Sequence, residues 1–544
     1  MTADTIADRQ DSGPLARTEV AVVRPSDARR SRRLAPAVAA LLVLAACGPA
    51  PSPMPTGATT VAGSPGPSGA AATAGPTGPL ADIPFADALR DAVDVDALTA
   101  DLRQLQSITD QHGGARPAGS EGHDAAAQFV ADQLRAAGFD VQLQPVDLPS
   151  FEQTGPSTLA VTGTATRSFD DLRDFKAMLF SPSANVTARI YALGFNPAAE
   201  PGDTGGLGCN PEDWLDVPPG VVVLVQPGNC RRHDVVVQAQ TAGAVGIVTA
   251  YPAWTRDRVL RPTLIEPADI RIPAIGTTQA VGQMLADAAA TGESVHLETH
   301  TSTETRSSVN VIGETPWGDP ARVVMLGGHL DSVVDGPGMN DDGTGTMATL
   351  EIARDIGRLT GMTGGEATAA RTPAWKVRVA FWTGEEIGLY GSRAYIHGEG
   401  AREAIEAYLN LDMLGSPNGV RLVYDGTVTS RPRQGLVIAG LLSQALDAAH
   451  LTWQTTYLGG SSDHASFDGA GIPIGGLFSG ANETKTAAQA GLFGGTADAP
   501  ADPCMHLPCD RVDTLDQTLL VELTRAGAWA VGRLASGEVD LSGL

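Results

Sequence analysis

The sequence has few basic residues and no apolar run long enough to cross a membrane. It contains 37 Lys and Arg against 62 Asp and Glu in 544 residues, a formal net charge of -25. This excess repels phosphate backbones and anionic lipid headgroups, which argues against nucleic acid as a partner and favours solubility after secretion. The apolar stretch at residues 34–46 is too short for a transmembrane helix.

Length and composition bound the organisation of the chain. With 42% hydrophobic and 18% charged residues, the chain is too apolar to be mostly disordered, and it is too long for one ordinary core. It contains no internal repeat. We therefore expect two folded domains with flexible tails.

The N-terminus has the features of an export signal. A group of arginines precedes the apolar stretch, so residues 1–46 are interpreted as a signal peptide. Its end, Leu44-Ala45-Ala46-Cys47-Gly48, is similar to the bacterial lipobox, in which the cysteine is acylated. The alternative is an ordinary signal peptide with an incidental cysteine. The arginines are Arg29, Arg30, Arg32 and Arg33.

Lipidation of Cys47 predicts a protein anchored to the outer face of the bacterial cell membrane, and without it the protein would be secreted. Residues 47–80 are almost entirely Gly, Pro, Ala, Ser and Thr, which cannot bury enough apolar surface to fold. We expect this segment to be a disordered tether, so that the membrane is reached only through the lipid.

The remaining cysteines are few and even in number: Cys209, Cys230, Cys504 and Cys509. In an exported chain they predict two disulfides, with three connectivities open. The sequence-local pairing is preferred, Cys209 with Cys230 and Cys504 with Cys509, because each pair brackets a loop-like segment. The short Cys504–Cys509 segment could instead be a metal knuckle, but no second cysteine pair lies near it.

Three segments with different patterns of predicted helices and strands follow the tether. Residues 81–155 predict helix, loop, helix and strand, and residues 156–303 contain short β-type runs typical of an inserted domain. Residues 304–544 alternate strands with helices, which predicts an α/β domain with a mostly parallel central sheet flanked by helices. In such sheets the site lies at the carboxyl ends of the strands.

Acidic residues and a histidine follow three predicted strands of this last segment. The strand at 323–326 leads to His329, the strand at 377–383 leads to Glu385 and Glu386, and Leu411 leads directly to Asp412. The glycine-rich loop at 336–345 adds an acidic pair, Asp341 and Asp342. Carboxylates gathered so closely repel one another, and a divalent metal is the simplest reason to gather them.

The nitrogen and oxygen ligands suit zinc in a catalytic site. The motifs resemble the bacterial co-catalytic di-zinc leucyl aminopeptidases over most of residues 307–534, and the likeness resumes before the insert from about residue 98. The motifs are Gly-Gly-His329-Leu-Asp331, Asn-Asp341-Asp342-Gly-Thr-Gly, Gly-Glu385-Glu386-Ile-Gly-Leu-Tyr-Gly-Ser, Asn-Leu-Asp412-Met-Leu-Gly-Ser and Cys-Met-His506-Leu-Pro-Cys-Asp.

The insert has a resemblance of its own. Residues 208–214 and 221–230 are similar to the protease-associated domain, in which a disulfide holds a loop and a strand leads to a Gly-x-Cys turn. Nothing in this segment suggests catalysis. The likeness implies a β-rich insert between the two parts of a peptidase domain.

The aminopeptidase resemblance implies two zinc ions. His329 and Asp412 would bind one ion, Glu386 and His506 the other, and Asp341 would bridge them. It implies that Glu385 is the general base and that Asp331 accepts the second N–H of the His329 ring. It also implies a cis peptide between Asp341 and Asp342.

The same likeness implies a substrate pocket. The Ser-Asp-His segment would line it, so His506 is preferred over His464 as the last ligand. Met505 stands where the family often has a tyrosine, and a thioether cannot donate a hydrogen bond to an oxyanion. The predicted pocket residues are Ser461, Asp463, His464, Phe467, Phe478 and Met505.

These features predict a metalloaminopeptidase that releases apolar N-terminal residues from peptides with a free N-terminus. The alternatives are a carboxypeptidase or glutaminyl-cyclase-like member of the same superfamily, and a relative that binds without catalysis. The sequence reveals neither the preferred residue nor the oligomeric state, and a Ca²⁺ site is not readable from it.

Overall fold

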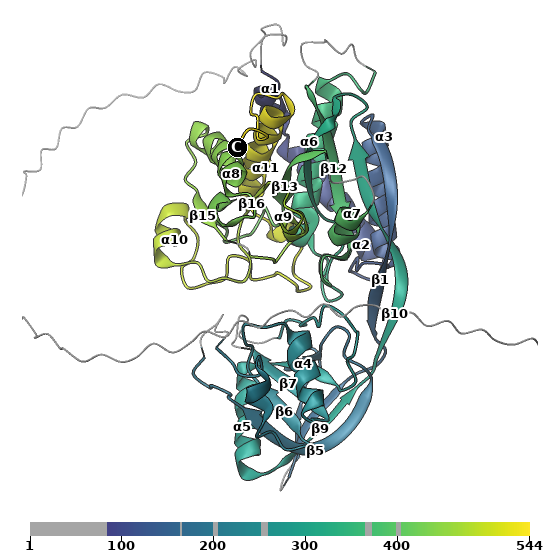
Figure 1. The fold of residues 1–544 in the computed structure, drawn as a ribbon, viewed down its shortest axis with the longest axis vertical. Helices are drawn as coiled ribbons and strands as arrows, with labels where there is room; N and C mark the ends of the chain where they lie inside the picture. Colours follow the sequence, from purple (N-terminus) through teal and green to yellow (C-terminus); the bar gives the residue numbers. More distant parts are fainter. Residues whose placement is uncertain are drawn as a thin grey trace, which may run out of the picture. The chain divides into compact units, whose positions relative to one another are not determined.

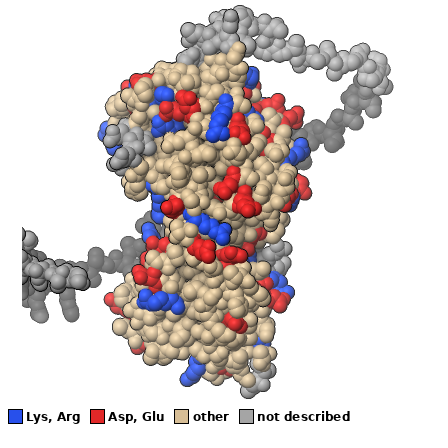
Figure 2. All heavy atoms as spheres, turned by 90° about the vertical axis from the view of Figure 1, so that its right-hand side faces the viewer, with Lys and Arg blue, Asp and Glu red and all other residues tan. Residues whose placement is uncertain are grey.

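The computed structural model describes residues 84–163, 166–199, 205–251, 259–364, 373–398, 404–457 and 459–544. The predicted signal peptide, Cys47 and the tether lie outside the described residues. Within the described ranges, no helix is long and apolar enough to cross a membrane. On the face shown in Figure 2, acidic and basic side chains are interspersed among uncharged residues.

The main sheet has eight strands in the order β1-β10-β12-β11-β13-β16-β14-β15. Its centre is parallel, since β12, β11, β13 and β16 run in one direction, whereas β1 and β10 are antiparallel at one side. This confirms the expected mixed, mostly parallel sheet. The strands are β1 (Asp140–Gln153), β10 (Thr301–Glu314), β11 (Asp319–His329), β12 (Trp375–Trp382), β13 (Ile405–Leu411), β14 (Leu422–Tyr424), β15 (Gln454–Thr456) and β16 (Ile474–Phe478).

Helices cover both faces of this sheet (Figure 1). Alternate residues of each strand enter different cores: Val324 and Leu326 of β11 pack with one set of helices, and Met325 between them packs on the other face. The first face carries α1 (Phe85–Ala92), α2 (Val95–Gln111), α3 (Glu121–Ala136), α6 (Gly345–Leu359), α8 (Pro432–Ala448) and α11 (Gln517–Ala535). The second carries α7 (Tyr390–His397) and α9 (His464–Gly469). The short α10 (Ala487–Phe493) contacts the same core through Phe493.

The insert is built on a second eight-stranded sheet, in the order β3-β2-β9-β5-β6-β7-β8-β4. Its strands β5 to β8 are parallel, and the disulfide between Cys209 and Cys230 is present, as is that between Cys504 and Cys509. The elements are β2 (Thr158–Thr162), β3 (Arg167–Phe169), β4 (Phe175–Ala177), β5 (Ala184–Leu193), β6 (Val222–Val225), α4 (Arg232–Thr241), β7 (Gly246–Tyr251), β8 (Ala274–Thr278), α5 (Gln279–Thr291) and β9 (Ser294–Thr299).

Strands β1 and β10 connect the insert to the main sheet. They pair along their full lengths, from Asp140 opposite Glu314 to Gln153 opposite Thr301. The chain therefore leaves the main sheet and returns to it through one two-stranded ribbon.

The predicted elements are largely present, with some differences at their ends. The strand expected at 323–326 is longer than predicted, so that His329 is its last residue. The C-terminal helix α11 was not predicted from the sequence. Its apolar side is covered by α1 and α8, which lie far from it along the chain.

The start of α6 predicts a pair of opposite stability effects. A Cβ on Gly345 would overlap the backbone oxygen of Leu411, whereas a Cβ on Gly440 within α8 meets nothing closer than the Gln444 side chain at 3.9 Å. We expect Gly345→Ala to destabilise the fold by about 1–3 kcal/mol and Gly440→Ala to stabilise it by about 0.5–1 kcal/mol. Unfolding midpoints of the two variants test this, and a Gly345→Ala midpoint at or above the wild-type value would contradict the packing argument.

Candidate active site

Four of the five predicted metal ligands lie at or just after the ends of adjacent central strands, or in the loop that follows β11. His329 ends β11, Glu386 lies four residues after β12 ends, and Asp412 directly follows β13. Asp341 lies between β11 and α6. Because β12, β11 and β13 are parallel neighbours, their carboxyl ends bring these side chains to one edge of the sheet.

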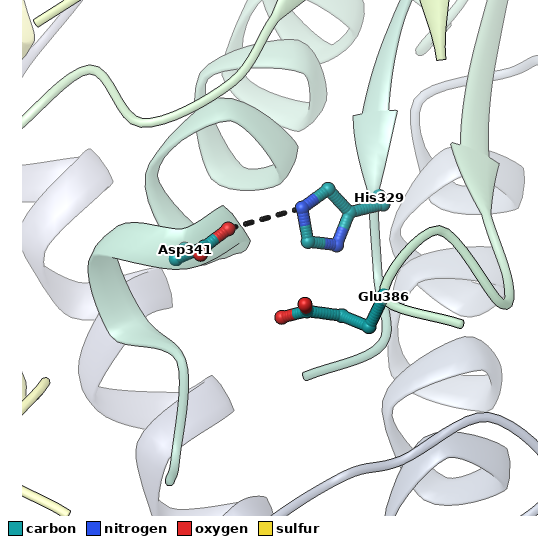
Figure 3. A group of neighbouring side chains, drawn as sticks. All are labelled: His329, Asp341 and Glu386. Atoms are coloured by element: carbon teal, nitrogen blue, oxygen red, sulfur yellow. Dashed lines mark hydrogen bonds and ion pairs between the residues drawn. The ribbon is translucent and has the colours of Figure 1, made fainter. Parts of the chain in front are cut away.

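One group of side chains centres on Asp341. Its Oδ1 lies 3.1 Å from Nε2 of His329 and its Oδ2 lies 3.0 Å from Nε2 of His506. The same His506 nitrogen is 3.1 Å from Oε2 of Glu386. Figure 3 shows the His329, Asp341 and Glu386 side chains turned toward a common space from three separate segments. Ligand atoms of these three residues lie within 4.8 Å of one another, as a metal site requires.

A second group centres on His329 and Asp412, whose Nε2 and Oδ1 are 3.8 Å apart. The carboxylate of Asp342, to which the sequence assigned no role of its own, lies in this group too. Its oxygens accept the backbone N–H groups of His329 (3.2 Å), Gly345 (2.8 Å) and Met413 (3.1 Å). Asp342 therefore ties the end of β11, the start of α6 and the segment after β13 together. The predicted cis peptide between Asp341 and Asp342 is confirmed.

Among the metal ligands, two carboxylate oxygens are buried without a hydrogen-bond partner in the described part of the chain. They are Oδ1 of Asp412 and Oε1 of Glu386, and the imidazoles beside them offer further ring nitrogens. A buried carboxylate oxygen without a donor is costly. The nitrogen and oxygen donors, close together and unsatisfied, fit a divalent cation.

The pKa values of the ligand side chains also indicate that the site requires positive charge. Burial raises the pKa of Asp412 to about 6, because His329 opposes the shift only in part and Asp341 adds repulsion. Burial alone would lower the pKa of each imidazole. The surrounding carboxylates, chiefly Glu385 for His329 and Glu386 for His506, instead raise it well above the ordinary value. Without a cation, this edge of the sheet gathers protons in its place.

Glu385 and Asp331 lie beside the ligands. Burial raises the pKa of Glu385 well above its ordinary range, and repulsion from Glu386 adds to the rise although His329 opposes it. Its Oε2 is 3.9 Å from Nε2 of His329. The carboxylate of Asp331 accepts the backbone N–H of Glu385 at 3.2 Å and lies within 3.4 Å of the backbone nitrogen of Glu386, which orients both glutamates.

The structure differs from the sequence prediction in the contact between Asp331 and His329. Nδ1 of His329 faces the backbone oxygen of Asp331 at 3.0 Å, whereas the Asp331 carboxylate is 3.8 Å away. The nearer acceptor for a ring N–H is thus the main chain. The carboxylate is directed instead to the turn after β12, a contact that no sequence pattern indicated.

His506 is held in a short loop by two buried aspartates. Asp510 accepts the backbone N–H of Asn340 at 2.7 Å and that of Asp341 at 3.2 Å, and Asp502 accepts those of Cys504 and Met505. The backbone of His506 is left-handed, with φ of 59°. A non-glycine residue keeps such a conformation only when its surroundings fix it. The two carboxylates and the Cys504–Cys509 disulfide supply that restraint.

Arg116 is a site component that sequence reasoning missed. It is fully buried, and its guanidinium donates to the backbone oxygens of Leu330 (2.6 Å), Pro337 and Gly338 (2.6 Å). It therefore fixes the loop between His329 and Asp341, and its charge faces the acidic cluster. Its glycine-rich surroundings gave no local signal, since all three partners lie more than 200 positions away in the sequence.

The predicted pocket residues are placed differently from one another. Met505 lies next to His506, with its sulfur 3.2 Å from Nδ2 of Asn482, and burial raises the pKa of Asp463 to about 7. Nε2 of His464 lies 3.0 Å from the backbone oxygen of Gly459. Phe467 is fully buried and stacks on Tyr408 with 3.8 Å between ring centres.

Of the other two, Phe478 is buried in the same core as Phe467, and Ser461 is exposed. The roles of these six residues in a pocket stay predictions.

Asp510 predicts a coupling between the two loops of the site. Replacing it by alanine leaves two buried N–H groups without acceptors, and we expect Asp510→Ala to lower the free energy of unfolding by about 2–3 kcal/mol and to weaken metal retention. Metal content after dialysis and chemical unfolding measure both effects. Asp513→Ala is the matched control, because Asp513 is exposed in the following turn. Equal metal retention in the two variants would contradict the coupling.

Comparison with known structures and sequences agrees with this geometry. Residues 310–530 match peptidase family M28, and residues 190–285 match the PA domain. The aminopeptidase of Aneurinibacillus sp. strain AM-1 has a TM-score of 0.64 at 23% identity, over 83% of this chain and 96% of that one. The folds are therefore alike.

Two curated relatives are closer in sequence. The probable lipoprotein aminopeptidase LpqL of Mycobacterium tuberculosis is 36% identical over 474 residues, which cover 84% of this chain and 88% of that protein. An aminopeptidase of Pseudomonas aeruginosa is 34% identical, over 77% of each chain. With this extent of likeness, the chain belongs to peptidase family M28 and carries an inserted PA domain.

Proposed function

We propose that the protein is a zinc-dependent aminopeptidase that releases single residues from the free N-terminus of peptides. The observation that carries this proposal is the convergence of His329, Asp341, Glu386, Asp412 and His506 at one edge of the sheet. Two of their buried carboxylate oxygens have no partner among the described residues. The names of the relatives, which are aminopeptidases, support the choice within the family.

The residues would hold two zinc ions. His329 and Asp412 would bind one and His506 and Glu386 the other, and Asp341 would serve both, since its two oxygens face the two histidines separately. When bound, the pair of ions polarises the scissile carbonyl and makes water a nucleophile near neutral pH.

Glu385 is the proposed general base. It is not needed as a ligand, its side chain is 11% exposed, and burial raises its pKa above the ordinary range, which is the direction that favours taking up a proton. It is proposed to accept the proton of the attacking water and to return it to the leaving amine. Asp331 orients it through the backbone N–H. The free α-amine of the substrate is proposed to lie against Glu385 and Asp412, which would select unblocked N-termini.

Export and anchoring belong to the proposal too. A relative named as a lipoprotein supports acylation at Cys47, with residues 48–80 as the tether. We also propose that the peptidase domain consists of residues 81–155 and 304–544 and is interrupted by the insert at 156–303. The matched PA segment, residues 190–285, lies inside that insert.

Activity is tested with leucine p-nitroanilide and its N-acetylated form. The unblocked compound should be cleaved and the blocked one should not, and Glu385→Gln should lower kcat by at least about 100-fold because the general base is lost. Released nitroaniline is followed by absorbance. The matched control is Glu483→Gln, which changes an exposed glutamate outside the ligand set. Cleavage of the acetylated compound at a similar rate would reject an aminopeptidase.

Metal binding should stabilise the fold more at neutral than at acidic pH. In the metal-free protein the pKa values of Asp331 and Asp412 are about 6, above the ordinary value for aspartate. The folded state therefore holds more protons than the unfolded state between about pH 4 and 6, so stability is lost as the pH rises through this window. Zinc replaces those protons.

The test is thermal unfolding of chelated and zinc-loaded protein at pH 5.0 and pH 7.5. The gain in Tm on adding zinc should be larger at pH 7.5. A gain that is equal at both pH values, or none at all, would contradict a site of this composition.

A further inference from the structure

A cavity of about 200 Å³ extends from the metal ligands to the inserted PA domain. On the peptidase side it is lined by Glu386, His506 and Asn482. On the side of the insert it is lined by Arg232, Tyr251 and Thr277. One continuous space therefore connects the proposed reaction centre with the inserted domain.

The charges on the far side of this cavity are mostly positive. Asp335 lies in the loop after His329. Its Oδ2 forms ion pairs with Nζ of Lys176 at 2.9 Å and with Nε of Arg261 at 3.0 Å. Burial favours a higher pKa for Asp335, but Arg261 and Lys176 hold it below its ordinary value. One carboxylate thus serves two cations of the insert, and this contact holds the insert against the peptidase loop.

Arg232 is a further cation of the same wall. Its Nε donates to the backbone oxygen of Thr263 at 2.9 Å, and among the described residues no Asp or Glu lies within ion-pairing distance of it. It is only partly exposed, and it is the first residue of α4, whose N-terminus has no side-chain cap. A guanidinium offers several N–H donors in a plane that matches a carboxylate.

Thr277 supplies an independent sign of a missing ligand. It is fully buried and lines the cavity, and its hydroxyl has no hydrogen-bond partner among the residues that the structure describes. Buried hydroxyls in folded proteins nearly always have one. An acceptor group entering the cavity would satisfy it.

A peptide whose first residue occupies the proposed site must place the rest of its chain beyond Glu386 and His506. We propose that the PA-domain wall of the cavity, through Arg232 with Thr277, binds a carboxylate carried by this remainder of the substrate. The carboxylate is either the C-terminus of a short peptide or an acidic side chain following the cleaved bond. The inference rests on the proposed aminopeptidase function and adds a substrate preference to it.

The test uses the zinc-loaded full chain with three peptides: Leu-Ala-Ala, its C-terminal amide, and Leu-Glu-Ala amide. Release of leucine is measured, and leucine p-nitroanilide establishes whether the enzyme is an aminopeptidase at all. At least one peptide that carries a carboxylate should have a kcat/KM about tenfold above that of the neutral amide, mainly through a lower KM. A gain for the free acid identifies the C-terminus as the ligand, and a gain for the glutamyl peptide identifies the side chain.

Variants assign the preference to the residue. Arg232→Gln should reduce the ratio between the preferred peptide and the neutral amide to about one, and Arg232→Lys should retain part of it. The ratio is measured within one variant, so partial misfolding affects both substrates equally. Arg271→Gln, at an exposed arginine of the same insert, should keep the wild-type ratio.

The failures can be told apart. If leucine p-nitroanilide is not cleaved, the proposed function fails and the inference fails with it. If it is cleaved but all three peptides react alike, or if Arg232→Gln keeps the wild-type ratio, the cavity wall does not bind a carboxylate.

Discussion

The structure depends on mutual repulsion among buried carboxylates at one edge of the main sheet. Water cannot screen these charges, so they require cations or protons close by. Much of the surrounding architecture can be understood as a way to hold them in place. Arg116 and the backbone amides that face Asp342 and Asp510 act on the loops, and the inner oxygens of Asp412 and Glu386 keep no hydrogen-bond partner among the described residues.

This constraint separates two kinds of acidic residue. Asp342, Asp502 and Asp510 use their oxygens on main-chain N–H groups and therefore shape loops. Asp341, Glu386 and Asp412 keep oxygens turned toward the imidazoles and so can bind an ion. A count of acidic residues in the sequence would group all of them together, and only the hydrogen bonds distinguish a scaffold carboxylate from a ligand.

The features that could be predicted from the sequence are those set by residues close together along the chain. The strand and helix alternation, His329, Glu386 and Asp412 were accessible because each side chain sits within a few residues of a strand whose periodicity is visible. His506 lies outside that alternation, so its assignment depended on resemblance. The roles of Arg116, Asp342 and Asp510 were missed because their partners are set by the fold: Arg116 meets Leu330 across 214 positions of sequence, and nothing local to it indicates the contact. The helix α11 was not predicted for a similar reason, since its apolar face packs against α1 and α8, which are distant in the sequence.

The ribbon of β1 and β10 also bears on how such a protein can fold and vary. At its end Gln153 is paired with Thr301, and the backbone N–H of Thr154 donates to the oxygen of His300 at 2.9 Å, so the insert begins and ends at one point in space. With respect to the main sheet, the whole insert therefore takes the place of a tight turn between β1 and β10, whatever the length of the insert. A domain whose own termini are adjacent can be exchanged at this position without disturbing the strands that carry the ligands, which makes the wall opposite the metal site a replaceable part.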